Sequence, residues 1–398
     1  MTKVSDRLNR LAESATLAMA RMSRELKDEG KDVIALSLGE PDFDTPEFIK
    51  EAAKQAITDN YSHYTPVPGL LELREAIVKK FKRDNNLDFT TDQIVTSTGA
   101  KQSLANLALS LLNKGDEVLL PCPYWVSYSE IIKLAEGIPV EIPSSIDSNF
   151  KITPKQLEKS ITKNTKMLIF SSPCNPSGTV YTQNELEDFG KILIKFPNII
   201  IVADEIYEHI NFTEEHFSIG RINELKNRVV TVNGVSKGFA MTGWRVGFIG
   251  APLWIAKACN KIQGQVTSAT CAVAQKATEK AMLADPKSTT LEMKKTFLRR
   301  RDLLLNELSK IPGVKCNIPQ GAFYIFPDIS YYFGKSNGKI NITNANDLCM
   351  FLLNSCHVAL VAGDAFGNPE CVRISYAASD KQLIEAAKRI KTQLNTLK

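Results

Sequence analysis

The chain has 398 residues, 43% of them hydrophobic, which is more than a single hydrophobic core usually holds, so we expect a large and a small domain. Charged residues make up 23% and the formal net charge is +5, but the lysines are spread through helical segments and form no basic arm. Nothing in this balance indicates nucleic acid or a membrane surface as a partner.

The first predicted element is a helical segment that Gly30 would end. Residues 1–26 include acidic side chains and no continuous apolar stretch, so we expect neither a signal peptide nor a membrane span. The eight cysteines form no CxxC pair, as is typical of reduced cytosolic thiols. These features predict a cytoplasmic protein.

Between residues 90 and 250, short β-rich apolar runs alternate with amphipathic segments such as 100–112 and 183–195. This alternation predicts crossover connections and an α/β fold, with a mostly parallel sheet covered by helices on both faces. Ligands of such sheets bind beyond the carboxyl ends of the strands, so polar residues there are candidate site residues. The expected strands are Gln93–Thr98, Glu117–Pro121, Lys166–Ser172, Ile199–Asp204, Arg228–Asn233 and Arg245–Gly250.

After about residue 290 the pattern changes to that of a smaller α+β domain, which the N-terminal segment would complete. We expect a long helix, three short strands and a terminal helix, over 291–309, 322–327, 358–362, 372–376 and from Asp380. The predicted division is a large domain over 46–296 and a small domain over 1–45 and 297–398.

The expected strand over 93–98 continues through Gly99 and Ala100 directly into a helix. Free backbone N–H groups at a helix start, approached closely because of the glycine, can bind an anion, and Lys101 would add a cation. An ordinary strand-to-helix turn is the alternative interpretation.

Two further strand ends carry polar side chains. Pro173 and Pro176 restrict the backbone around Asn175 and would hold its amide at a defined point, although Asn-Pro-Ser-Gly is also a common turn sequence. Asp204 follows five apolar residues, and a carboxylate buried there needs a positive or hydrogen-bonding partner. Tyr207 would reach the same pocket, whereas a helix N-cap explains Asp204 without any function.

Lys237 lies between two apolar strands, in a run of small residues, eight positions before Arg245. Most lysines are solvated surface residues, and that is the alternative here. A lysine in a desolvated pocket near other cations has a lowered pKa and becomes a nucleophile toward carbonyl groups.

One cofactor needs all of these features at once. Pyridoxal phosphate requires a lysine for its aldehyde, a carboxylate for its ring nitrogen and a cationic, amide-lined phosphate site. The matching segments are SKGFAMTGWRVG around Lys237, ADEIYEHI around Asp204 and Tyr207, SPCNPSGTV around Asn175, VRISYA around Arg373, and SLGEPDFDTP, YTPVPGLLELREAI, PYWVSY and PQGAFYIF. From the first helix to the last, the sequence resembles the class-I aminotransferases of fold type I, and among them the bacterial aspartate aminotransferases of the prokaryotic subgroup.

This resemblance implies a catalytic set of Lys237, Asp204 and Tyr207. Lys237 would hold pyridoxal phosphate as a Schiff base and, once a substrate amine displaces it, carry the proton between the substrate α-carbon and the cofactor. Asp204 would pair with the ring nitrogen, and Tyr207 and Asn175 would hydrogen-bond the ring 3-oxygen.

The remaining binding residues also follow from the resemblance. Arg373 would clamp the substrate α-carboxylate, with Gly39 lying beside it in a mobile segment that closes over the substrate. Trp125 would stack on the ring and, like Asn175, contact the substrate, although a half-buried core aromatic is the alternative. Tyr64 would reach the phosphate from a neighbouring subunit, which predicts a homodimer with shared sites. The phosphate site itself would comprise Gly99, Ala100, Lys101, Ser236 and Arg245.

The expected reaction moves the amino group of L-aspartate to 2-oxoglutarate, giving oxaloacetate and L-glutamate. No residue of the sequence can be assigned to binding a second substrate carboxylate, so aromatic amino acids, alanine and prephenate are alternative substrates. Some prephenate-active relatives carry a lysine where this chain has Leu11, Ala12 and Glu13, which argues against prephenate.

Other classes of protein fit less well. A pyridoxal-phosphate-sensing regulator would need a basic helix-turn-helix extension, and we expect none because the resemblance begins within the first few residues. The sequence has no GxGxxG after a strand and no GxxxxGK[ST], which argues against a nucleotide-binding enzyme. The histidines, at 63, 209, 216 and 357, form no HExxH motif or Cys/His cluster, so we expect no metal site, and His209 is expected to continue a helix after Tyr207.

Overall fold

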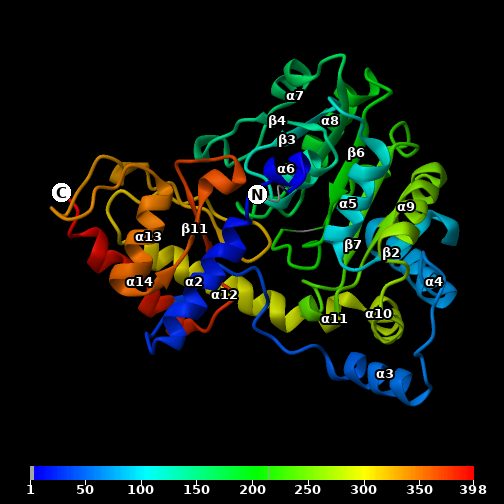
Figure 1. Cartoon of the computed structure of the whole chain (residues 1–398), viewed down its shortest axis with the longest axis horizontal. Coiled ribbons are helices and arrows are strands. Elements are labelled where there is room, and N and C mark those ends of the chain that lie inside the picture. Colours follow the sequence, from blue (N-terminus) through cyan, green and yellow to red (C-terminus); the bar gives the residue numbers. More distant parts are fainter. Residues whose placement is uncertain (1–3, 214) are drawn as a thin grey trace.

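A seven-stranded sheet forms the centre of the larger part of the molecule in the computed structural model, which describes residues 4–213 and 215–398 (Figure 1). The strand order is β2-β8-β7-β6-β5-β3-β4. β8 pairs antiparallel with both β2 and β7, and every other neighbouring pair is parallel, so the predicted mostly parallel sheet is confirmed. The strands are β2 (Ile94–Ser97), β3 (Glu117–Pro121), β4 (Ile138–Ile142), β5 (Thr165–Ser171), β6 (Ile200–Asp204), β7 (Val229–Gly234) and β8 (Gly247–Gly250).

The edge strand β4 was not among the expected strands. Its sequence, IPVEI, contains a proline and a glutamate, and only Ile142 of the five residues is buried. An edge strand needs neither a continuous apolar run nor a full set of N–H donors, so its sequence signal is weak.

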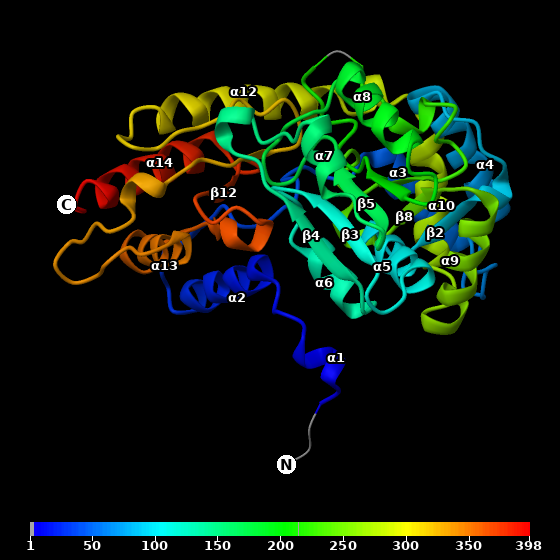
Figure 2. The ribbon, with the colours of Figure 1, turned by 90° about the horizontal axis from the view of Figure 1, so that it is seen from above.

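Helices cover both faces of the sheet, as predicted, because successive strand residues point to opposite faces. In β6, for example, Ile200 and Val202 pack toward one helix layer and Ile201 and Ala203 toward the other. One layer contains α5 (Ala100–Leu111), α6 (Ser127–Leu134) and α9 (Leu253–Val266), and the other α7 (Pro154–Ser160), α8 (Gln183–Ile194), α4 (Leu71–Lys80) and α10 (Ala272–Leu283), with α3 (Glu47–Thr58) packed on α10 (Figure 2).

The smaller part joins the two ends of the chain. β1 (Ile34–Ala35) pairs in parallel with β10 (Val358–Ala359), and a second sheet has the antiparallel order β11 (Val361–Ala362), β12 (Val372–Ser375), β9 (Tyr324–Ile325). The expected strand over 358–362 is therefore two strands in two different sheets. The helices here are α2 (Ala15–Asp28), α12 (Leu291–Leu308), α13 (Ala345–Cys356) and α14 (Asp380–Leu394), and the remaining short ones are α1 (Asp6–Asn9) and α11 (Pro286–Thr289).

The division into a large domain over 46–296 and a small domain over 1–45 and 297–398 stays a prediction. α3 begins next to the first boundary, at Glu47, whereas α12 runs without interruption through residues 296 and 297 (Figure 1). Among the described residues, no helix combines the length and the apolar character needed to cross a bilayer.

Candidate active site

A cavity of about 440 Å³ lies where the carboxyl ends of the central strands meet the smaller part of the chain. Ser171 ends β5 and Asp204 ends β6, whereas Arg373 comes from β12 of the small sheet. Besides these three, the lining residues are Ser14, Thr16, Leu17, Leu38, Gly39, Glu40, Ala100, Lys101, Trp125, Val126, Ser127, Tyr128, Asn175, Ile206, Tyr207, Ser236, Lys237, Thr242, Gly243, Arg245 and Tyr324.

Asp204 is a buried carboxyl group held by two hydrogen bonds. The Tyr128 hydroxyl donates to its Oδ2 at 2.7 Å, and the backbone N–H of Ile206 donates to its Oδ1 at 3.2 Å. Burial raises the pKa of Asp204 to about 6, and these hydrogen bonds hold it below the value that burial alone would give.

No helix follows Asp204, so the N-cap interpretation of this residue and the expected helix at His209 are both wrong. Residues 206–209 form turns. The chain then pairs with a distant segment, since Ala322 donates its N–H to the carbonyl of Ile210 and Phe212 donates to that of Gln320. These tertiary hydrogen bonds replace the i→i−4 bonds that a helix would have made.

Lys237 points into the cavity and not toward bulk solvent, so the surface interpretation of this lysine is wrong. Its Nζ donates to the carbonyl oxygen of Gly39 at 2.5 Å and lies 5.9 Å from the centroid of the Tyr207 ring. Burial lowers the pKa of Lys237 to about 8, and the positive charge of Arg373 adds to this effect. About a tenth of this amine is therefore unprotonated, and nucleophilic, at pH 7, far more than for an ordinary lysine.

Arg373 is a buried cation that lines the cavity and is only 1% exposed. Its Nη1 donates to Asn175 Oδ1 at 3.0 Å and its Nη2 donates to the carbonyl of Ser37, while its Nε has no hydrogen-bond partner in the described chain. The guanidinium lies over the Tyr324 ring, 4.7 Å from its centroid. A buried guanidinium with a free N–H and no carboxylate is suited to binding an anion.

Gly99 and Arg245 form a tight contact at the start of α5. Gly99 is the N-cap of this helix, with a φ of +84°, and a Cβ at that position would lie 2.3 Å from Arg245 Nη2. Because no side chain is present, the guanidinium lies directly against the backbone of the helix start. N–H groups of a helix start next to an arginine are suited to binding a phosphate.

Positive charge exceeds negative charge in the cavity. Within the described residues, none of its four cationic side chains makes an ion pair with a carboxylate, namely Lys101, Lys237, Arg245 and Arg373. Asp204 and Glu40 are the acidic residues of the lining, and Glu40 accepts a hydrogen bond from the Thr242 hydroxyl. The cavity therefore favours a ligand with more than one negative charge.

A family model described as aminotransferase class I and II matches residues 31–390. The chain belongs to this family. It is 44% identical to an aspartate/prephenate aminotransferase of Nitrosomonas europaea, over 99% of this chain and 100% of that protein. A bifunctional aspartate aminotransferase and glutamate/aspartate-prephenate aminotransferase of Petunia hybrida is 45% identical over 99% of this chain and 83% of its own length. The solved structure of an aspartate aminotransferase from Rhizobium meliloti superposes with a TM-score of 0.96, at 40% identity, covering 100% of both chains.

The family and the fold type implied by the resemblance are thus confirmed, and this aminotransferase is an enzyme. The structure also gathers most of the expected site residues in one cavity: Gly39, Ala100, Lys101, Trp125, Asn175, Asp204, Tyr207, Ser236, Lys237, Arg245 and Arg373 all line it. Gly99 lies behind the lining, against Arg245. Tyr64 is 99% exposed and lies outside the cavity of its own chain, so its role toward a partner subunit stays a prediction.

Two tyrosines of the aminotransferase cavity were not among the expected site residues. Tyr128 binds Asp204, and the Tyr324 hydroxyl lies 2.8 Å from that of Tyr207. Both belong to segments that carried the resemblance, PYWVSY and PQGAFYIF. Their contacts join residues 76 and 117 positions apart, so no local pattern signalled them.

The residues present fit pyridoxal phosphate, the cofactor that the family implies. Lys237 provides an amine of lowered pKa, and Asp204 provides a buried carboxyl group in the same cavity. Gly99 leaves space for Arg245 at the helix start, where a phosphate would bind, and the unpaired Nε of Arg373 leaves a donor for a carboxylate. A volume of about 440 Å³ lies in the range that small-molecule sites occupy.

Proposed function

We propose that this aminotransferase transfers the amino group of L-aspartate to 2-oxoglutarate with pyridoxal phosphate as cofactor, forming oxaloacetate and L-glutamate. The observation that carries the proposal is the position of the Lys237 amine and the Asp204 carboxyl group in one cavity, with Arg373 on its wall. The names of the three relatives, all of which include aspartate aminotransferase or aspartate/prephenate aminotransferase, give further support.

Lys237 and Asp204 would carry the proton chemistry. When bound, pyridoxal phosphate supplies an aldehyde that condenses with amines and a ring that accepts electrons. Lys237 would bind that aldehyde and, once released, take the proton from the substrate α-carbon, a task that suits an amine with a pKa near 8. Asp204, fixed by Tyr128, would hold a proton on the ring nitrogen.

Orientation of the substrate would depend on Arg373, Asn175 and Tyr207. The buried guanidinium of Arg373 would bind the α-carboxylate through N–H groups that no protein carboxylate occupies. Asn175, whose Oδ1 is bound by Arg373, would donate an amide N–H into the cavity, and Tyr207 would donate its hydroxyl to the ring 3-oxygen. Burial and Tyr324 raise the pKa of Tyr207, so it stays a protonated donor.

The phosphate would bind at the start of α5. The backbone N–H groups there, with Ser236 and the cations of Lys101 and Arg245, match the charge and the donor needs of a phosphate. Trp125, which has the Lys101 Nζ 5.0 Å from its ring centroid, would stack on the pyridine ring.

We further propose that the enzyme is a cytoplasmic homodimer. The exposed Tyr64 would contribute its hydroxyl to the phosphate site of the partner subunit. Gly39 and Glu40 would close over the bound substrate, because they line the cavity and accept hydrogen bonds from Lys237 and Thr242.

A screen of amino donors and 2-oxo acids with the purified protein tests the substrate proposal. L-aspartate with 2-oxoglutarate should give the highest kcat/KM, and a preference for aromatic amino acids or alanine would contradict it. Lys237→Ala tests the cofactor assignment separately, since this variant should fold but lack the visible absorption band of the lysine-bound cofactor. An unchanged spectrum would refute the role of Lys237.

Prephenate is a second candidate acceptor, favoured by the names of the Nitrosomonas europaea and Petunia hybrida relatives. The sequence was expected to disfavour prephenate because of residues Leu11, Ala12 and Glu13. This segment lies near the cavity, since Ser14 and Thr16 line the cavity and the Ala12 N–H donates to Glu130 Oε2 at 2.8 Å. Low activity with prephenate therefore stays a prediction, and including prephenate in the acceptor screen tests it.

A further inference from the structure

A cluster of buried ionisable side chains lies directly behind the turn that carries Asp204 and Tyr207. Along this turn, Asp204, Ile206 and Tyr207 line the cavity, whereas Glu205 and Glu208 are buried on the other side of the backbone. The turn therefore has two faces, one in the active site and one in the buried cluster.

Lys80 is the central cation of this cluster. It is the last residue of α4 and is only 1% exposed. Its Nζ pairs with Glu208 Oε1 and donates to Asn85 Oδ1 at 2.5 Å. Asn85, at the end of the π-helical turn Phe81–Asn85 and also fully buried, donates from Nδ2 to Glu208 at 2.6 Å and to Glu205 at 3.0 Å. One lysine and one amide thus connect α4 with both glutamates of the turn.

Each glutamate of the cluster has a nitrogen-bearing partner within it. Glu208 pairs with Lys80, and Glu205 Oε2 lies 3.0 Å from Nε2 of the buried His216. Burial alone would lower the pKa of His216, but the charge of Glu205 raises it above its ordinary value, which favours an ion pair between these two side chains. Asp84 lies on the same side, 3.9 Å from Lys80, and pairs with Arg83 at 2.6 Å.

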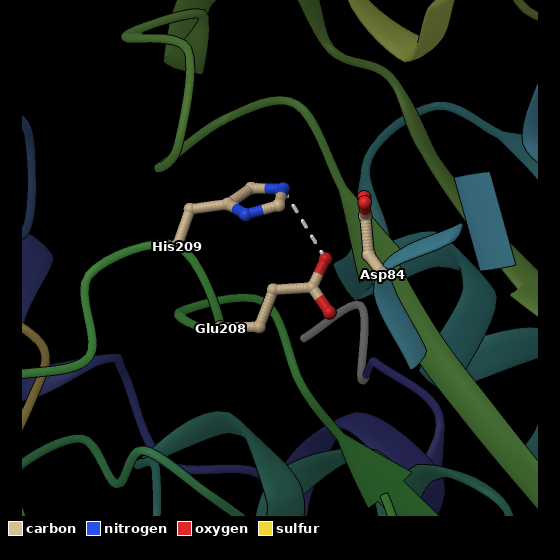
Figure 3. Close-up of side chains that lie close together, drawn as sticks. All are labelled: Asp84, Glu208 and His209. Carbon is tan, nitrogen blue, oxygen red and sulfur yellow. Dashed lines mark ion pairs between the residues drawn. The ribbon is translucent and has the colours of Figure 1, made fainter. Parts of the chain in front are cut away.

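Figure 3 shows Glu208 and His209 projecting toward Asp84, an arrangement of carboxylates and imidazole that could hold a metal ion. Lys80 already provides the cation here, since its ammonium group contacts Glu208 and lies near Asp84. A divalent ion would have to displace this buried ammonium group. The cluster is therefore better explained as a support for the turn.

The same cluster also contacts the segment that carries Lys237. His209, whose Nε2 lies 3.3 Å from Glu208 Oε1, packs against Gly238, where an added Cβ would lie 2.7 Å from His209 Cδ2. Gly238 directly follows Lys237, so the imidazole ring fills the space behind the lysine backbone. Both segments with proposed catalytic residues are therefore backed by one ion-pair cluster.

We propose that Lys80 is a positioning residue that holds the turn over residues 205–209, and with it Asp204 and Tyr207, in the active-site geometry. Without Lys80, Glu208 would be a buried carboxylate without its main cation, next to Glu205, because the ligand atoms of Glu205, Glu208 and His216 lie within 4.8 Å of one another. Their mutual repulsion would be relieved by movement of the turn, which would displace the residues on its cavity face. The inference rests on the proposed roles of Asp204 and Tyr207.

Lys80→Met tests this inference, with Lys151→Met as the matched control. Lys151 makes a more exposed pair with Glu185, at 2.8 Å, away from the cavity, so it controls for the loss of a lysine ion pair. In the cofactor-free proteins, amide hydrogen exchange over residues 204–210 should be about tenfold faster in Lys80→Met and unchanged in Lys151→Met. In the holoenzymes, Lys80→Met should lower kcat about tenfold with KM within about threefold, and should shift the pH midpoint of the visible band of the cofactor.

A second pair of variants covers the case in which Lys80→Met fails to fold. Glu208→Gln keeps the shape of the side chain but removes the charge that Lys80 pairs with, and it should also accelerate exchange over 204–210. The double variant Lys80→Met with Glu208→Gln removes both charges, so no unpaired charge of this pair remains. Its kcat should therefore recover to within about threefold of the wild-type value.

Wild-type exchange, pH midpoint and kcat in folded Lys80→Met or Glu208→Gln would overturn the inference. A loss of thermal stability without any of these local changes would do the same. A wild-type protein without a visible band or transamination would instead refute the proposed function, and the exchange measurement separates the two outcomes because it needs no cofactor.

Discussion

The amine of Lys237 should destabilise the cofactor-free enzyme. The change in the free energy of unfolding in Lys237→Met measures this effect. Burial lowers the pKa of this amine from 10.5 to about 8. Between these two values the unfolded chain binds more protons than the folded chain, so the free energy of unfolding of the wild-type protein rises with pH across this window. Well below pH 8 the full unfavourable contribution of the desolvated charge remains.

The expected magnitude follows from the two pKa values and from one hydrogen bond. A pKa lowered by this much corresponds to about 3 kcal/mol. The hydrogen bond from Lys237 Nζ to the Gly39 carbonyl, which methionine cannot make, offsets about 1 kcal/mol of that. Lys237→Met should therefore raise the free energy of unfolding by about 2 kcal/mol at pH 7, and this gain should disappear by about pH 10.

Urea denaturation of the cofactor-free wild-type and variant proteins at both pH values provides the measurement. Groups that titrate equally in both proteins cancel in the difference, and Lys114→Met, at an exposed lysine, controls for the removal of a positive charge. A Lys237→Met protein that is no more stable than wild type at pH 7, or whose gain is the same at pH 10, would refute the assignment of Lys237 as a desolvated amine.

Further predictions concern the residues around this amine. Gly99→Ala should weaken cofactor binding at least about tenfold in equilibrium titrations, because its Cβ would clash with Arg245 at a φ of +84°; unchanged affinity would argue against a phosphate at the helix start. Tyr128→Phe removes the 2.7 Å hydrogen bond to Asp204 and should lower kcat about tenfold, which steady-state kinetics would show. Because burial raises the pKa of Asp204 to about 6 from 3.8, the folded state binds the extra proton, and the contribution of Asp204 to stability should fall as pH rises from about 4 to 6; in urea denaturation the cofactor-free wild type should become less stable relative to Asp204→Asn across this range. Arg373→Lys should raise the KM for the amino donor about a hundredfold, because lysine cannot make a bidentate contact, and a normal KM would exclude Arg373 as the carboxylate site.

The central strands could be predicted from the sequence because they are buried on both faces and therefore consist mainly of apolar and β-branched residues. β4 was missed, since IPVEI lies at the edge of the sheet and only one of its five residues is buried. The antiparallel direction of β8 was equally hidden, because an apolar run carries no information about strand direction. The helix expected at His209 was wrong because the hydrogen bonds of residues 210–212 go to residues 320–322.

The candidate site likewise contains residues that local sequence patterns could indicate and residues that they could not. Gly99, Asn175, Asp204 and Lys237 could be found as polar or small residues at the ends of apolar strands, where parallel sheets bind ligands. Residues from the small part, such as Arg373, could be assigned only through the family resemblance, because no local pattern relates β12 to the central sheet.

The sequence by itself determined which residue types follow which buried strands. This pattern was enough to indicate the α/β fold and the family, and to single out Lys237 and Asp204. The tertiary structure decided their chemical state. The pKa of Lys237 and that of Asp204 depend on how many atoms exclude water from them and on which charges lie nearby, and these neighbours, such as Tyr128 and Gly39, come from segments far away in the chain.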